Sequence, residues 1–358
     1  MWRVNLVFGL SLALSMALTP LVRNLALRMG FVDVPVARSV HKEPKPFLGG
    51  VAIFLAFAAA VAAGGGLAEQ EVVGILVGGF LVVLLGLVDD RFRLRPRTKL
   101  LGQILAAAVL VYGFQVQIAS IYSHLGDRYI QFGPLAGPLT IFWIVAFTNV
   151  VNLIDGLDGL AAGISSIASV TLLIVAMLHG FNSAAMVTAA LAGATIGFLR
   201  YNFNPAKIFM GDAGAMFLGY TLGAISVHGM MKTTATVGVL VPVMALGLPI
   251  MDTALAIIRR VASGRPIGEA DKDHLHHRLL RLGLSHRATV LVMWAVSAWL
   301  GLSAVAVTEV STSEAMIIVG VVFVGLIWGA RKLGLLRVTE EESRHNTTRS
   351  ATMGSGRN

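Results

Sequence analysis

Long apolar segments separated by short polar ones dominate the hydrophobic pattern of the chain. Most are long enough to cross a hydrocarbon core of about 30 Å at about 1.5 Å per residue. They fall at residues 3–22, 49–66, 72–88, 100–118, 138–154, 159–179, 183–200, 213–229, 236–258, 289–308 and 314–331. The pattern predicts an all-α polytopic membrane protein with about eleven transmembrane helices. Only 13% of the residues are charged, which excludes an ordinary soluble domain of this length.

The basic residues predict the orientation of these helices. Of the 28 Lys and Arg residues, 25 lie in segments that follow odd-numbered apolar segments, and the exceptions are Arg3, Arg128 and Lys232. Positively charged loops stay in the cytoplasm, so we expect the N-terminus outside and the C-terminus in the cytoplasm. This bias also accounts for the net charge of +9 without a nucleic-acid partner. The absence of cysteine excludes disulfides, thiol nucleophiles and cysteine-ligated zinc.

Polar residues gather at the predicted cytoplasmic ends of the apolar segments, where each needs a partner or a function. Asp89 and Asp90 end the third segment, and five basic residues follow them. Two adjacent carboxylates can bind a divalent cation, or divide into one ligand and one base. The alternative is a stop-transfer charge cluster with Asp–Arg pairs.

Four polar residues spaced three apart end the fifth segment: Asn149, Asn152, Asp155 and Asp158. In an unbroken helix the first and last would point in opposite directions, so they converge only if the helix ends. Gly156 and Gly159 are suited to end it. We therefore expect the first three along one helical edge and Asp158 in the turn. Simple capping of a helix end explains one or two of these residues, but hardly four.

Two further clusters lie in predicted cytoplasmic connections. Asp212 precedes an apolar run, where it either caps a helix or binds a metal ion, and Phe209 is either an interfacial aromatic or a stacking platform. The other cluster contains three histidines, His274, His276 and His277. A zinc site there lacks a third protein ligand, so donation to a phosphate or sugar fits better, with a solvated basic face as the alternative.

Glycine and proline mark three other features. Gly49 and Gly50 let another backbone or a ligand approach the start of the second segment. Pro242 and Pro249 predict a bend in segment 236–258, which would help to form a groove for a lipid tail. The sequence from 129 to 133 predicts a small hairpin in an outward loop.

Together and in this order, these motifs resemble the polyprenyl-phosphate N-acetylhexosamine-1-phosphate transferase family of glycosyltransferase 4 type. The resemblance runs from Val32 to Leu284 and rests on Asp-Asp, Asn-x-x-Asn-x-x-Asp-Gly-x-Asp-Gly, Phe-Met-Gly-Asp and His-x-His-His. Pro46-Phe47-Leu48-Gly49-Gly50 and the interrupted histidine run resemble the branch that transfers N-acetylglucosamine-1-phosphate from a UDP-sugar to undecaprenyl phosphate. The sibling phospho-N-acetylmuramoyl-pentapeptide transferase, which carries Pro-Thr-Met-Gly-Gly and contiguous histidines, is the alternative. Ala213-Gly214-Ala215 departs from the Thr-Gly-Ser that is common in the family.

The resemblance implies a role for each matching residue. It implies that Asp89 deprotonates the lipid phosphate, with Asp90 beside it as a second catalytic residue that orients the site or the metal. It implies Asp212 and Asn152 as Mg²⁺ ligands, with Mn²⁺ as a substitute. The implied substrate-binding residues are Lys42, Lys99, Asn149, Asp155, Asp158, Phe209, His274, His276 and His277. Among these, Lys99 would contact phosphate, and Lys42, Asp158 and Phe209 would form the uracil pocket.

The implied protein is a single transmembrane catalytic domain over 1–336, with a disordered cytoplasmic tail over 337–358. It would work in the cell inner membrane with its active site facing the cytoplasm, on a UDP-sugar donor and a polyprenyl phosphate acceptor, with a homodimer as a candidate assembly. The alternative of a different class is a secondary transporter. Transporters place ionisable groups near the bilayer midplane in repeated halves, whereas these acids lie at one interface and we detect no repeat.

Overall fold

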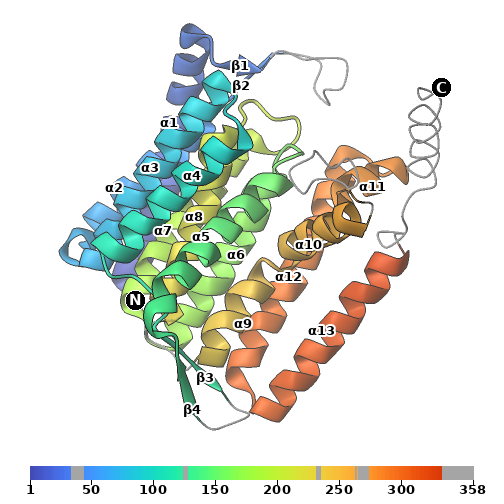
Figure 1. The fold of residues 1–358 in the computed structure, drawn as a ribbon. Coiled ribbons are helices and arrows are strands. Elements are labelled where there is room, and N and C mark those ends of the chain that lie inside the picture. Colours follow the sequence, from blue (N-terminus) through green and yellow to red (C-terminus); the bar gives the residue numbers. More distant parts are fainter. Residues whose placement is uncertain (34–43, 124–127, 231–234, 263, 265–273, 333–358) are drawn as a thin grey trace, which may run out of the picture.

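The computed structural model describes residues 1–33, 44–123, 128–230, 235–262, 264 and 274–332. Within these ranges long helices lie side by side in one bundle, and a small hairpin lies at each end of it (Figure 1). The predicted class, an all-α polytopic membrane protein, is confirmed. The proposed tail over 337–358 and Lys42 lie outside the described residues.

All eleven predicted apolar segments coincide with helices. The first four are α1 (Trp2–Met29), α2 (Gly49–Ala63), α3 (Gln70–Phe92) and α4 (Pro96–Ala108), and a π-helical turn, Val109–Gly113, extends α4. The next four are α5 (Ala136–Ile154), α6 (Leu160–Leu178), α7 (Asn182–Asn202) and α8 (Gly211–Met230). The ninth segment divides into α9 (Ala235–Ala245) and α10 (Gly247–Ala262), and the last two are α12 (His286–Glu309) and α13 (Thr312–Lys332). A short helix outside the predicted segments, α11 (Leu275–Arg281), precedes α12.

Seven of the described helices are long and apolar enough to span a membrane, or eight when α9 and α10 count as one bent span. Helix α2 is apolar but shorter. The number eleven and the orientation of the bundle therefore stay predictions.

The predicted bend in segment 236–258 is present as an angle of 78° between α9 and α10. It lies beside Pro249, the third residue of α10, which has no N–H to donate to a carbonyl in the preceding turn. Pro242 lies inside α9, whose hydrogen bonding continues past it because the Leu246 N–H donates to the Pro242 carbonyl at 3.1 Å. We therefore attribute the bend to Pro249 rather than to Pro242.

The two hairpins are antiparallel. Strand β1 (Val32–Asp33) pairs with β2 (Lys45–Pro46), and β3 (Ser120–Ser123) pairs with β4 (Arg128–Gln131). The second hairpin contains most of the segment that was predicted to form one. Helix α8 is almost completely buried between α2, α3 and α5, whereas α13 stands at the edge of the bundle with most of its surface exposed (Figure 1). The residues at the start of α8 are therefore surrounded by other helices.

Candidate active site

Four helix ends meet around the ammonium group of Lys99. Lys99 lies in the first turn of α4, and its Nζ is 2.8 Å from Asp89 Oδ2 at the end of α3 and 2.8 Å from Asp212 Oδ1 at the start of α8. Asn152, near the end of α5, completes the group. With its amide oriented to suit both neighbours, its nitrogen donates to Asp212 Oδ1 at 2.8 Å and its oxygen accepts from Lys99 Nζ at 3.0 Å. Residues from three distant parts of the chain, 89–99, 152 and 212, thus form one cluster.

The adjacent residues Asp89 and Asp90 bind different partners. Besides Lys99, Asp89 accepts a hydrogen bond from the Leu94 N–H at 2.8 Å, just after α3 ends. Asp90 instead accepts from the N–H groups of Asp212 and Ala213 at 2.8 and 3.3 Å. It therefore caps the first turn of α8 from a neighbouring helix, where the helix dipole favours a negative charge. Because Asp90 supplies the cap, the carboxylate of Asp212 is available to Lys99.

Glycines make this close contact between helices feasible. A Cβ at Gly86 of α3 would lie 2.2 Å from Ala213 Cα, and a Cβ at Gly50 of α2 would lie 2.2 Å from the Gly214 nitrogen. The Gly50 N–H donates to the Met210 carbonyl at 2.9 Å, so the predicted approach of another backbone to the double glycine is confirmed. Small residues are the usual means of close helix contact in lipid.

The Asn-x-x-Asn-x-x-Asp motif ends α5, as predicted, but Asp155, which was expected on one helical edge with Asn149 and Asn152, lies just past the last helical residue in a non-helical conformation. The helix stops at Ile154, and Gly159 has a left-handed φ of 80° immediately before α6. Asn149 lies one turn before Asn152. Its Nδ2 donates a hydrogen bond to Oε1 of the buried Gln103 at 2.7 Å. Burial, followed by the charges of Asp212, Asp90 and Asp158, raises the pKa of Asp155 to about 7. Asp155 thus belongs to the same electrostatic group as the Lys99 cluster.

Asp158 and Phe209 are both tied to the connection between α7 and α8. Asp158 Oδ2 accepts from Asn204 Nδ2 at 3.1 Å and from the Ala206 N–H at 2.9 Å. The backbone of Phe209 is held on both sides, since its N–H donates to Pro46 and its carbonyl accepts from Gly49. Their predicted contact with uracil stays a prediction.

The histidines lie in and beside α11. His274 precedes the helix and is paired with Asp252 of α10, with 3.0 Å between Nδ1 and Oδ2. The buried ring of His276 lies against the turn after Asp155, because a Cβ at Gly156 would be 2.5 Å from its Nε2. His277 packs on His276 with ring centroids 4.2 Å apart. In the described part of the chain no group of three or more His, Cys, Asp or Glu is arranged to hold a metal ion by itself.

Three residues of this region were not predicted from the sequence: Gln103, Gly86 and Asp252. For Asp252 a signal was available, because a carboxylate inside the apolar segment 236–258 calls for a partner. Gly86 precedes Asp89 by one helical turn, but nothing in its surroundings in the sequence marks it as a contact point. Gln103 gave the same signal, as an amide inside the apolar segment 100–118, but its partner Asn149 is distant in sequence.

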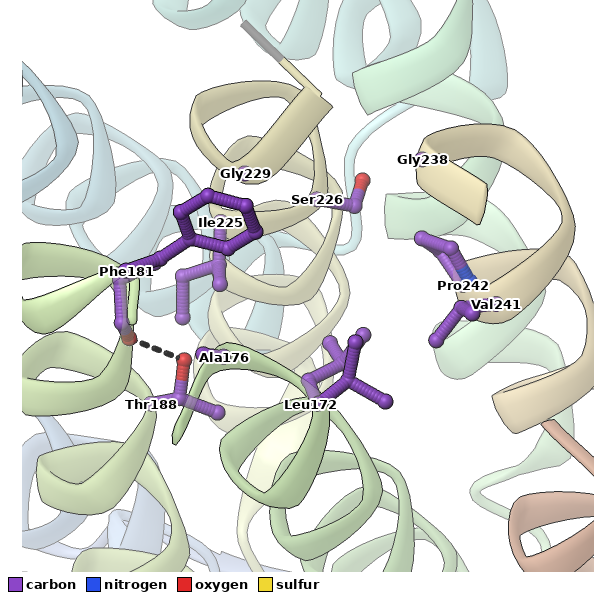
Figure 2. Close-up of a pocket in the computed structure, with 12 residues that line it drawn as sticks. Leu172, Ala176, Phe181, Thr188, Ile225, Ser226, Gly229, Gly238, Val241 and Pro242 are labelled. Atoms are coloured by element: carbon purple, nitrogen blue, oxygen red, sulfur yellow. Dashed lines mark hydrogen bonds between the residues drawn. The ribbon is translucent and has the colours of Figure 1, made fainter. Parts of the chain in front are cut away.

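A cavity lies at the other end of the bundle. It is partly open and lies between α6, α7, α8 and α9, and its lining is almost entirely apolar. Figure 2 shows Phe181, Ile225 and Pro242 around it. Ser226, also in the lining, follows Asp212 by fourteen residues along α8, which places the cavity about 20 Å from the acidic cluster. The cavity is therefore separate from the candidate active site.

Comparison with known proteins identifies the family. The family described as glycosyl transferase family 4 matches residues 72–230. A probable undecaprenyl-phosphate N-acetylglucosaminyl 1-phosphate transferase of Bacillus subtilis is 39% identical over 337 residues, covering 94% of both chains. A decaprenyl-phosphate N-acetylglucosaminephosphotransferase of Mycolicibacterium smegmatis is 38% identical over 312 residues, covering 79% of this chain and 76% of the relative. The matched region holds Asp89, Asn152 and Asp212, and the chain belongs to glycosyl transferase family 4.

Proposed function

We propose that this enzyme transfers N-acetylglucosamine-1-phosphate from UDP-N-acetylglucosamine to undecaprenyl or another polyprenyl phosphate and releases UMP. The observation that carries the proposal is the convergence of Asp89, Asn152 and Asp212 on Lys99 at one end of the bundle. The names of the relatives from B. subtilis and M. smegmatis support both the sugar and the lipid class. The product would start a lipid-linked glycan of the cell envelope.

The active site would face the cytoplasm in the cell inner membrane. The end of α3 and the starts of α4 and α8 meet at this cluster, and the connections that border them, 89–99 and 200–212, hold seven Lys and Arg residues. Positive residues stay on the cytoplasmic side. A UDP-sugar is soluble and anionic, so it would arrive from that side, while the lipid phosphate lies at the membrane surface.

Asp212 and Asn152 would hold Mg²⁺. The donor set fits, because Mg²⁺ prefers oxygen ligands and is usually held by one or two carboxylates together with substrate phosphates and water. The position of Lys99 supports this, since the oxygens of both residues already contact a cationic group. Bound there, the ion would supply neutralisation of the charge that develops on the diphosphate.

The lipid phosphate would attack the donor directly. One of its oxygens forms a bond to the β-phosphorus, and the bond from that phosphorus to the bridging oxygen breaks, so that UMP leaves with the electron pair. Asp89 would take the proton of the lipid phosphate. Its carboxylate is buried and held by Lys99 and the Leu94 N–H, which suits a fixed base better than a nucleophile that must approach phosphorus. Lys99 would contact the phosphates as they enter.

The connection between α7 and α8, together with α11, would bind the UDP-sugar donor. Phe209 would stack on uracil, with Asp158 holding the connection in place. His276 would contact the diphosphate or the sugar, because both of its ring nitrogens are buried without a partner among the described residues. Burial, together with the neighbouring His277, lowers the pKa of His276 to about 3. Its ring is therefore neutral and carries one donor and one acceptor.

Incubation of the purified protein with UDP-N-acetylglucosamine, undecaprenyl phosphate and Mg²⁺ tests the proposal through UMP release. We expect release that requires all three components and that Asp212→Asn abolishes. A panel of UDP-sugars that includes UDP-N-acetylmuramoyl-pentapeptide tests the donor. Release with the pentapeptide donor alone would assign the sibling activity, and no release with any donor would favour a transporter.

A further inference from the structure

A carboxylate is buried in the middle of α10, away from the Lys99 cluster. Only one face of this helix is buried, and it consists of Leu248, Pro249, Asp252 and Ala256. Asp252 is 2% exposed. A charge in such a position costs several kcal/mol unless partners satisfy it, so its contacts identify its role.

Both oxygens of Asp252 bind the start of α11. Oδ1 accepts from the Leu275 N–H at 2.9 Å, and Oδ2 lies 3.0 Å from His274 Nδ1. Leu275 is the first residue of α11, and His274 is its N-cap residue. Asp252 therefore fixes where α11 begins and which nitrogen of His274 faces away from α10.

The contacts continue from His274 toward the acidic cluster. The His274 and His276 rings are stacked, with centroids 5.9 Å apart and planes 6° apart. His276 in turn lies against Gly156, the residue after Asp155. The bend at Pro249 turns α10 away from the axis of α9, and Asp252 follows the bend within one helical turn. One buried carboxylate thus links the bent span to the histidine segment and to the end of α5.

We infer that Asp252 is a positioning residue of this transferase, which holds His274 with its proton on Nδ1 and leaves Nε2 to the donor substrate. A carboxylate that binds one ring nitrogen of histidine sets its tautomer and orientation. The inference rests on the proposed function, because it gives His274 a task in binding or turnover.

Asp252→Asn separates this role from a merely structural one. The amide oxygen still accepts from the Leu275 N–H, but the amide nitrogen must donate to His274 Nδ1, so the proton moves to Nε2. In ¹⁵N-histidine spectra of the purified protein, the Nδ1 signal of His274 is assigned as the one that disappears in His274→Gln. In Asp252→Asn this signal should change from that of a protonated nitrogen to that of an unprotonated one. We expect kcat/KM for UMP release to fall about 10- to 100-fold.

Kinetics of a double-mutant cycle supply the second readout. If Asp252 acts through His274, the double variant Asp252→Asn/His274→Gln should lose no more activity than His274→Gln alone. Asp252→Glu keeps the carboxylate and should be more active than Asp252→Asn. This second variant keeps the inference testable if Asp252→Asn folds poorly. Ser183→Ala is the matched control, because it removes the buried 2.9 Å contact between Ser183 and His228 at the opposite end of the bundle. It should leave kcat/KM unchanged.

Two results would overturn the inference while wild-type protein releases UMP: multiplicative losses in the double variant, or an unchanged Nδ1 signal in Asp252→Asn. Failure of the wild type to release UMP from any donor would instead count against the proposed function. The ¹⁵N signal can still be read in that case, since it needs no substrate.

Discussion

Replacing Gly86 by alanine should damage the active site although this residue carries no side chain and is buried between two helices. Gly86 lies in α3, one turn before Asp89, and it faces the first turn of α8. The added Cβ would lie 2.2 Å from Ala213 Cα and 2.4 Å from the Ala213 nitrogen. Both atoms are backbone, so the contact can be relieved only by moving one helix away from the other.

The required movement follows from these distances. Ordinary contact of a Cβ begins at 3.4 Å, so the start of α8 must retreat by about 1.2 Å. The capping bonds from Asp212 and Ala213 to Asp90 and the contact between Asp212 and Lys99 lie within one turn of this point. A displacement of 1 Å in a reacting group can cost about 100-fold in rate. We therefore expect kcat/KM for UMP release to fall about 100-fold in Gly86→Ala.

Gly79→Ala supplies the matched control. Gly79 lies two turns earlier on the same face of α3, but a Cβ there would meet only side chains, the nearest being Phe217 at 3.1 Å. Alanine also favours a helix by about 0.5–1 kcal/mol over glycine, so this variant should stay stable and active. UMP release and thermal unfolding of both variants check the prediction. Activity of Gly86→Ala within twofold of wild type would refute the argument from helix contact.

Three further predictions test other parts of the site. Phe209→Ala should raise KM for the UDP-sugar about tenfold or more, because stacking on a base is worth about 1–3 kcal/mol, and an equal rise in KM for the lipid would contradict stacking. The pKa of Asp155 is raised, so its carboxyl stays protonated to a higher pH in the folded protein than in the unfolded chain. Without divalent cations, the stability of the protein should therefore fall as the pH rises from about 4 to about 7. Asp155→Asn should reduce this fall in melting temperature, and identical pH profiles would argue against the shift. Pro249→Ala restores an N–H to α10 and should raise KM for the lipid if the bend forms part of the tail groove; an unchanged KM would remove that role.

The fold was predictable because apolar length is a strong local signal. Every predicted segment corresponds to a helix, and the break in segment 236–258 follows from Pro249. What the sequence left open is which helices touch. The contact between Gly86 and Ala213 joins residues far apart in the chain, and periodicity within α3 gives no information about its partner on α8.

The candidate site could be predicted as a set of residues but not as a set of contacts. Asp89, Asn152 and Asp212 were all expected near one another, and the structure brings them together around Lys99. Lys99 itself was expected only as a phosphate contact. Its place between two carboxylates depends on the start of α4 facing α8, which no local pattern specifies.

The Asp89–Asp90 pair shows why adjacency in sequence is a poor guide to shared function. Consecutive residues of a helix point about 100° apart, so two neighbouring carboxylates at the end of α3 cannot easily serve one partner. Asp90 faces α8 and binds its first N–H groups, whereas Asp89 faces α4 and binds Lys99. One residue therefore organises the helix that carries Asp212, and the other remains beside the cation. Removing either carboxylate would disturb the cluster, but by different routes: loss of Asp90 moves Asp212, and loss of Asp89 leaves Lys99 with one carboxylate partner instead of two.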